Sequence, residues 1–69
     1  MKISARNTVK GRIRKVVVGP VSAEVVLDAA PGIEIVAVIS ANSAKSLKLK
    51  KGKKAYAVIK ASSVMIATD

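Results

Sequence analysis

The chain has 69 residues, with 13 Lys and Arg against 4 Asp and Glu, a formal net charge of +9, and neither Cys nor His. These counts exclude a disulfide framework, a thiolate or imidazole zinc site and a protein-made calcium cage. A Ser-His or Cys-His nucleophile would lack its base, so we expect no enzyme activity, no catalytic cofactor and no metal-cation site. No apolar run approaches the roughly 20 residues of a membrane span, so we expect one cytoplasmic domain over residues 1–69 and no membrane segment.

The hydrophobic residues are mostly small and favour strands. Eleven are Ala, 18 are Val or Ile, and Tyr56 is the only aromatic residue, a composition typical of β structure. A domain of this size buries only about 60% of its unfolded surface and usually needs disulfides, a bound metal or oligomerisation for stability. Because disulfides and protein-bound metals are excluded, oligomerisation is the remaining source of stability. Because self-repulsion opposes a compact state, the excess positive charge also predicts an anionic ligand or partner.

The first predicted element is one long strand over residues 9–17. Its residues alternate between a basic face and an apolar face that is interrupted at Lys15. The basic face carries Lys10, Arg12 and Arg14. Gly19-Pro20 then ends the strand.

Two further strands are predicted over 21–29 and 33–40, joined by a turn at 30–32. The residues expected to face inward are Val21, Ala23, Val25, Leu27 and Ala29 in the second strand, and Ile33, Ile35, Ala37 and Ile39 in the third. The third strand also carries Val36 and Val38 on its opposite face, so we expect it to be covered on both sides, one of them by another subunit.

The alternation is lost over 41–49, where the residues favour one or two helical turns capped by Ser40, Asn42 or Ser43. A charged turn at 50–53 precedes a fourth strand over 55–60, and a fifth is predicted over 64–67. The chain is therefore expected to be all-β with one short helix. Five strands with a helix between the third and fourth is the element order of an oligonucleotide-fold-like barrel.

The available functional groups are cations, hydroxyls and backbone amides, which bind anions. Ser4 and Arg6 are two residues apart and would share one strand face, so that both side chains can reach the same oxygen atoms. Ser40 and Ser43 lie at the start of the predicted helix, where free N–H groups favour an anion. Lys60 ends a strand. Each of these residues is individually more common as an ordinary surface or cap residue.

Taken together, these residues stand in a pattern that resembles the molbindins, small cytoplasmic proteins that bind molybdate and tungstate. The resemblance covers essentially the whole chain, and its most specific pieces are Ser4-Ala5-Arg6-Asn7 and Val58-Ile59-Lys60-Ala61-Ser62. Further matching segments are Lys10-Gly11, Val21-Ser22-Ala23-Glu24-Val25, and Ile39 to Ala44 with Leu47, Leu49 and Gly52.

The resemblance implies a five-stranded barrel assembled as a hexamer, a trimer of dimers, that holds oxyanions between subunits for storage and homeostasis. One class of site would use Ser4, Arg6, Lys60 and the Ala61 amide of one subunit with Ser40 and Ser43 of a neighbour. Asn7 would orient the loop of Arg6. Val21 and Ser22 are candidates for a second class of site on a symmetry axis.

A second hypothesis is a single-stranded nucleic-acid-binding module, because the chain is strongly basic and has the element order of an oligonucleotide-fold barrel. Such modules usually stack bases on aromatic rings, and Tyr56 is the only one present. We therefore favour the oxyanion-binding function and do not expect nucleic acid as a partner. The excess of Lys and Arg is open to three interpretations: a solvated surface, a field that concentrates oxyanions, or contact with nucleic acid or another acidic partner.

Overall fold

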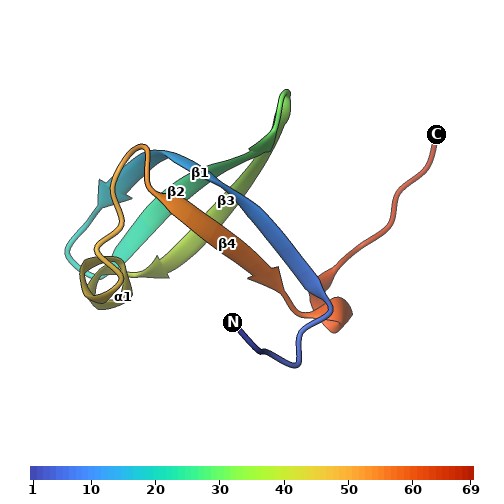
Figure 1. The fold of residues 1–69 in the computed structure, drawn as a ribbon, viewed down its shortest axis with the longest axis horizontal. Helices are drawn as coiled ribbons and strands as arrows, with labels where there is room; N and C mark the ends of the chain where they lie inside the picture. Colours follow the sequence, from blue (N-terminus) through green and yellow to red (C-terminus); the bar gives the residue numbers. More distant parts are fainter.

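The computed structural model describes residues 1–69 as one curled, four-stranded antiparallel sheet with a short helix at one end (Figure 1). The strands lie in the order β3-β2-β1-β4. The elements are β1 (Asn7–Val18), β2 (Ser22–Ala30), β3 (Ile33–Ser40), α1 (Ala41–Ser46), β4 (Lys54–Ile59) and a 3-10 turn, η1 (Ala61–Ser63). The expected class, all-β with one short helix in a barrel-like curl, is confirmed.

The long strand β1 joins the two halves of the sheet. Its first part, from Asn7 to Arg12, pairs with β4, and its second part, from Arg12 to Val18, pairs with β2. Where the partners change, Gly11 lies against β2 so closely that a Cβ atom there would be 2.3 Å from the carbonyl oxygen of Asp28. Glycine thus permits the close approach that curls the sheet.

The interruption at Lys15 is explained by a β-bulge. The register of β1 against β2 shifts between Ile13 and Lys15, which leaves Arg14 as the extra residue. Before the bulge the inward residue is Ile13, and after it Val16 is half-buried while Lys15 and Val17 are exposed. The simple alternation predicted for 9–17 is therefore wrong beyond the bulge, because one inserted residue exchanges the two faces of the strand.

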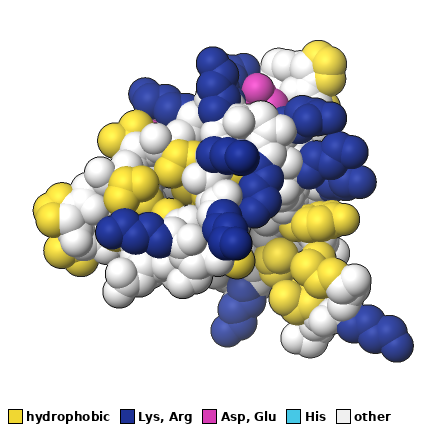
Figure 2. Space-filling model, turned by 60° about the vertical axis from the view of Figure 1, so that its left-hand side comes forward, with side chains coloured by type: hydrophobic (Ala, Val, Ile, Leu, Met, Phe, Trp, Pro, Cys, Tyr) yellow, Lys and Arg dark blue, Asp and Glu magenta, His cyan; other side chains and the backbone are white.

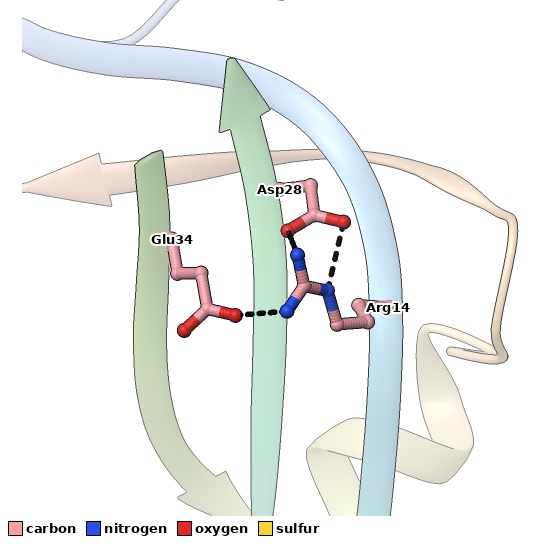
Figure 3. Close-up of polar contacts among 3 residues, drawn as sticks. All are labelled: Arg14, Asp28 and Glu34. Carbon is pink, nitrogen blue, oxygen red and sulfur yellow. Dashed lines mark hydrogen bonds and ion pairs between the residues drawn. The ribbon is translucent and has the colours of Figure 1, made fainter. Parts of the chain in front are cut away.

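The bulge also aims Arg14 at two carboxylates on the neighbouring strands (Figure 3). The guanidinium lies 2.8 Å (Nη2 to Oδ1) and 3.0 Å (Nε to Oδ2) from Asp28, and Nη1 pairs with Oε2 of Glu34. The hydrogen bond and charge of Asp28, and then the charge of Glu34, raise the pKa of Arg14. This cluster ties β1, β2 and β3 together at their exposed face.

The core lies on the concave side of the sheet and is small. Seven of the 69 residues are buried, and the central cluster consists of Ile13, Val25 and Leu27. Half-buried neighbours that pack on it are Val16, Ile35, Ile39, Leu49, Ala55 and Ala57. The helix α1 adds the buried residues Ala41 and Ala44. A largely apolar hollow of about 350 Å³ remains beside this core, so a single chain fills its interior incompletely.

Several residues expected to be inside are exposed in the single chain. Val21 precedes β2 and is 80% exposed, and Ile33 at the start of β3 is 56% exposed. Both stand at strand ends, beyond the curl of the sheet that buries the residues further along. On the outer face of β3, Val36 and Val38 are also exposed. No part of the same chain covers this apolar face, so its predicted covering by another subunit stays a prediction.

The predicted fifth strand over 64–67 is not formed. These residues are exposed, Met65 by 91% and Ile66 by 86%, and they extend away from the sheet (Figure 1). Alternating apolar residues favour a strand only where a sheet edge is available, and this tail leaves η1 away from both edges of its own sheet. Neither helix of the structure has the length and apolar character needed to cross a membrane.

Candidate anion-binding site

Four of the predicted site residues line one open pocket: Ser4, Arg6, Lys60 and Ala61. The pairing of Asn7 with Ile59 brings them together, because the chain entering β1 then lies beside the chain leaving β4. The Asn7 side chain strengthens this junction by donating from Nδ2 to the carbonyl of Ile59 at 3.3 Å. Asn7 therefore fixes the base of the segment that carries Arg6.

The local conformation of Ser4 and Arg6 differs from the prediction. Both precede β1, which begins at Asn7, so they do not share a strand face. Ser4 and Arg6 lie beyond the first paired residue of β1, so no neighbouring strand forms ladder hydrogen bonds with them. They nevertheless line the same pocket, because the Asn7–Ile59 junction directs the whole entering segment past Lys60.

The pocket contains two cations and no carboxylate. The chain's ion pairs are those of Arg14, so Arg6 and Lys60 have no acidic partner. Lys60 is the N-cap of η1, and its carbonyl accepts from the N–H of Ser63 at 2.9 Å. The first amides of a helical turn have no partner within that turn, so the Ala61 N–H is available as a donor. These groups suit an anion with several oxygen atoms.

Three further residues of this pocket, Ala5, Val58 and Ser62, were not in the predicted set. Ser62 adds a second hydroxyl, and Val58 forms part of an apolar wall. Ser62 could have been found from its place in the turn after Lys60, where Ser residues commonly supply hydrogen bonds. Val58 carries no polar signal, and only the β4 register places it there.

The other two predicted residues, Ser40 and Ser43, lie at the start of α1. Of the three predicted cap residues, Ser40 is the N-cap: its Oγ accepts from the N–H of Ser43 at 3.0 Å and donates to the Ser43 Oγ at 2.8 Å. Both side chains are exposed. Figure 1 shows α1 and η1 at opposite ends of the sheet. One chain therefore does not bring Ser40 and Ser43 to Arg6 and Lys60.

The second-site candidates adjoin this α1 end. Ser22 pairs directly with Ser40 across β2 and β3, and the carbonyl of Val21 accepts from the N–H of Ala41 at 2.9 Å. Val21 and Ser22 thus lie beside the hydroxyl pair rather than beside Arg6 and Lys60. We call these two groups the candidate half-sites, a cationic one at the β1–β4 junction and a hydroxyl one at α1.

The chain is thus a small, curled β-sheet domain whose pocket of Arg6 and Lys60 holds no carboxylate, which makes it a candidate anion-binding domain. Comparison with known proteins gives its family. A family model described as TOBE domain matches residues 3–66. The chain belongs to the TOBE domain family.

Relatives cover the whole chain. It is 44% identical over 69 residues to a protein of Haemophilus influenzae named "Probable molybdenum-pterin-binding protein", with full coverage of both chains. Its fold is similar to that of MopII from Clostridium pasteurianum, at a TM-score of 0.91 and 43% identity, covering 97% of this chain and 100% of that one. It is equally similar, at a TM-score of 0.91 and 37% identity, to a molybdate binding protein from Sporomusa ovata, covering 99% and 100% of the two chains. The resemblance to the molbindins is confirmed.

Proposed function

We propose that this chain binds molybdate or tungstate between subunits, for cytoplasmic storage and homeostasis and without catalysis, and that residues 1–69 form one binding domain. The observation that carries the proposal is the pocket of Ser4, Arg6, Lys60 and Ala61, which offers two unpaired cations and no carboxylate. The names of the similar proteins, which refer to molybdenum-pterin and molybdate binding, support the choice of anion.

The donor set fits a tetrahedral dianion. Arg6 presents a planar fork of N–H groups, Lys60 a compact ammonium, and Ser4 and the Ala61 amide add directed donors. Together they supply the charge and the hydrogen bonds that four oxygen atoms of an oxyanion can accept. Sulfate has the same shape and charge, so discrimination against it rests on the size of the completed cavity, because Mo–O bonds are longer.

The site is proposed to be completed by a neighbouring subunit. The cationic half-site and the pair of Ser40 and Ser43 lie at opposite ends of one chain (Figure 1). In the dimer we propose, the two chains lie antiparallel about a two-fold axis. The cationic end of each then meets the α1 end of the other, and two composite sites form together. The small core and the exposed Val36, Val38, Met65 and Ile66 supply apolar surface for such contacts. The proposed hexamer, a trimer of dimers, is the assembly that the resemblance to the molbindins implies.

The first test is native mass spectrometry of the purified protein with molybdate, tungstate or sulfate. We expect a hexamer that takes up a fixed number of molybdate or tungstate ions and no sulfate. Arg6→Ala and Lys60→Ala should each weaken molybdate binding about 10- to 100-fold, because a hydrogen bond to a charged group contributes about 1.5–3 kcal/mol. Lys51→Ala, which removes an exposed cation outside both the pocket and α1, is the matched control. Unchanged affinity in both pocket variants would refute the site.

Mixed assemblies test whether the site is composite. Arg6→Ala chains keep an intact α1 half-site, and Ser43→Ala chains keep an intact cationic half-site. If each site joins halves from two chains, a 1:1 mixture refolded together regains about a quarter of the high-affinity sites, the fraction expected from random association. If one chain supplied both halves, no high-affinity site would return. Mass spectrometry of the mixture counts the bound anions and shows that the chains have exchanged.

A further inference from the structure

A second cationic surface lies apart from the candidate oxyanion site. Lys10, Arg12 and Lys54 line one open pocket, and Lys15, Lys50 and Lys51 line another. Arg14 lines both, so the two pockets adjoin at that residue. We call the six cations other than Arg14 the basic belt. None of them lines the pocket of Arg6 and Lys60.

The basic belt is not neutralised by the protein. Asp28 borders the first pocket, but it and Glu34 are engaged by Arg14 (Figure 3). Arg12 and Lys54 are direct partners across β1 and β4, an arrangement in which two like charges destabilise a sheet. Figure 2 brings the side with the α1–β4 connection forward and shows Lys and Arg side chains spread across this face with little acidic surface among them. A bound anion would offset this repulsion.

The extent of the basic belt favours a ligand with several spaced charges. A single tetrahedral oxyanion contacts one point, whereas the basic belt runs from the pocket beside the β2–β3 turn, past Arg14, to the start of the α1–β4 turn. Arg12 is held in place by donating from Nη1 to the carbonyl of Gly52 at 3.1 Å, which joins the β1 part of the basic belt to that turn. A linear chain of phosphate groups matches such a track.

Tyr56 favours nucleic acid over a phosphate chain without bases. It pairs directly with Lys10 across β1 and β4, two residues from the Arg12–Lys54 pair, so its ring lies on the same outer face as these cations. Tyr56 as a whole residue is 51% exposed, and its hydroxyl makes no hydrogen bond within the chain. An exposed ring beside a basic track can stack a nucleic-acid base while the cations contact the backbone.

Against the expectation from the sequence, we propose that the basic belt and Tyr56 bind single-stranded nucleic acid, without sequence preference, on the outer face of the sheet. The proposal rests on these residues and is independent of the oxyanion function. If all six cations contact phosphates, affinity falls about 300-fold between roughly 50 and 200 mM salt, because each contact releases counterions. Loss of the Tyr56 ring weakens binding about tenfold.

The test is fluorescence anisotropy of the full chain with labelled oligo-dT and oligo-dA across that salt range. The double variant Arg12→Glu, Lys54→Glu should lose most of the affinity and flatten the salt dependence. The matched control is Lys45→Glu, Lys48→Glu, which changes net charge equally at residues that line neither pocket. We expect the control to retain most of the affinity. An equal loss in the control, or no binding at the lowest salt, would overturn the proposal.

Inorganic polyphosphate serves as the competing ligand. Tyr56→Leu should weaken binding of the oligonucleotides and leave binding of polyphosphate unchanged, since only a base can stack on the ring. Equal affinity of Tyr56→Leu and the unaltered chain for oligonucleotides would overturn the assignment to nucleic acid. The variants at Arg12, Lys54 and Tyr56 are also compared with the unaltered chain for molybdate uptake and assembly mass, which should stay unchanged because these residues lie outside the oxyanion pocket and outside α1.

Discussion

Gly11 is the position where the curl of the sheet leaves no room for a side chain. An added Cβ would lie 2.3 Å from the carbonyl oxygen of Asp28, 2.9 Å from its carbonyl carbon and 3.0 Å from Cγ of Leu27. The first two atoms are backbone and cannot rotate away. Gly11→Ala therefore forces β1 and β2 apart by about 1 Å to restore an ordinary contact.

The loss in the free energy of unfolding follows from the packing and the hydrogen bonds that this movement disturbs. Overpacking by one methyl group costs about 1–3 kcal/mol, and weakening the adjacent ladder hydrogen bonds adds about 1 kcal/mol. Ala restricts the unfolded chain more than Gly does, and this offsets about 0.4–1 kcal/mol of the lost stability. The net loss is about 2 kcal/mol, which corresponds to about 8–16 °C in Tm for a domain of this length.

Thermal unfolding followed by circular dichroism measures this loss, with each variant at the same concentration because assembly contributes to stability. Gly19→Ala is the control, since its added Cβ meets only the carbonyl oxygen of Ser22, at 3.2 Å. We expect a much smaller change there. A Tm for Gly11→Ala within about 2 °C of the unaltered chain would show that β1 and β2 do not approach as described.

Three further predictions concern the core, the helix cap and the ion-pair cluster. Ile13 is 2% exposed, so Ile13→Ala should cost about 2–5 kcal/mol and Ile13→Val about 0.5–1.5 kcal/mol, measured as shifts of the urea midpoint at constant slope. Ser40→Ala should lower stability by about 1 kcal/mol and also weaken molybdate binding, whereas Ser43→Ala should affect mainly binding, because only Ser40 caps α1. The pKa of Arg14 is raised in the folded state. Its contribution to stability is therefore complete below its unfolded pKa and is lost only as pH rises through the higher folded pKa. The difference in Tm between Arg14→Gln and the unaltered chain should thus stay constant between about pH 6 and 10. A difference that disappears within that range would contradict the assignment.

The sequence predicted the strands well where burial follows a strict alternation. The third strand, 33–40, has the predicted bounds, and the helix falls within 41–49. The bulge at Arg14 could not be located, because Lys15 in an apolar position signals an irregularity without saying which residue is inserted. The tail at 64–67 has the pattern of a strand, but whether it forms one depends on a partner edge that its own sheet does not offer.

For the candidate site, residue type was more informative than local conformation. Arg6 and Lys60 are cations without acidic neighbours in sequence, and the structure keeps them unpaired. Their convergence depends on the Asn7–Ile59 pairing, a contact between residues far apart in the chain that periodicity does not specify. The separation of Ser40 and Ser43 from this pocket likewise follows from the strand order, which places α1 at the far end of the sheet (Figure 1).

Arg14 connects the fold to the charge of its surface. By engaging Asp28 and Glu34, it occupies two of the four carboxylates of the chain beside the basic belt. Arg14→Gln would therefore remove one positive charge and also leave two negative charges free next to Lys10 and Arg12. Because those carboxylates would then repel phosphate, oligonucleotide binding should weaken by more than in Lys48→Gln, which removes the same charge outside the basic belt without freeing a carboxylate. Anisotropy at low salt compares the two variants, and equal affinities would mean that Asp28 and Glu34 do not influence the belt.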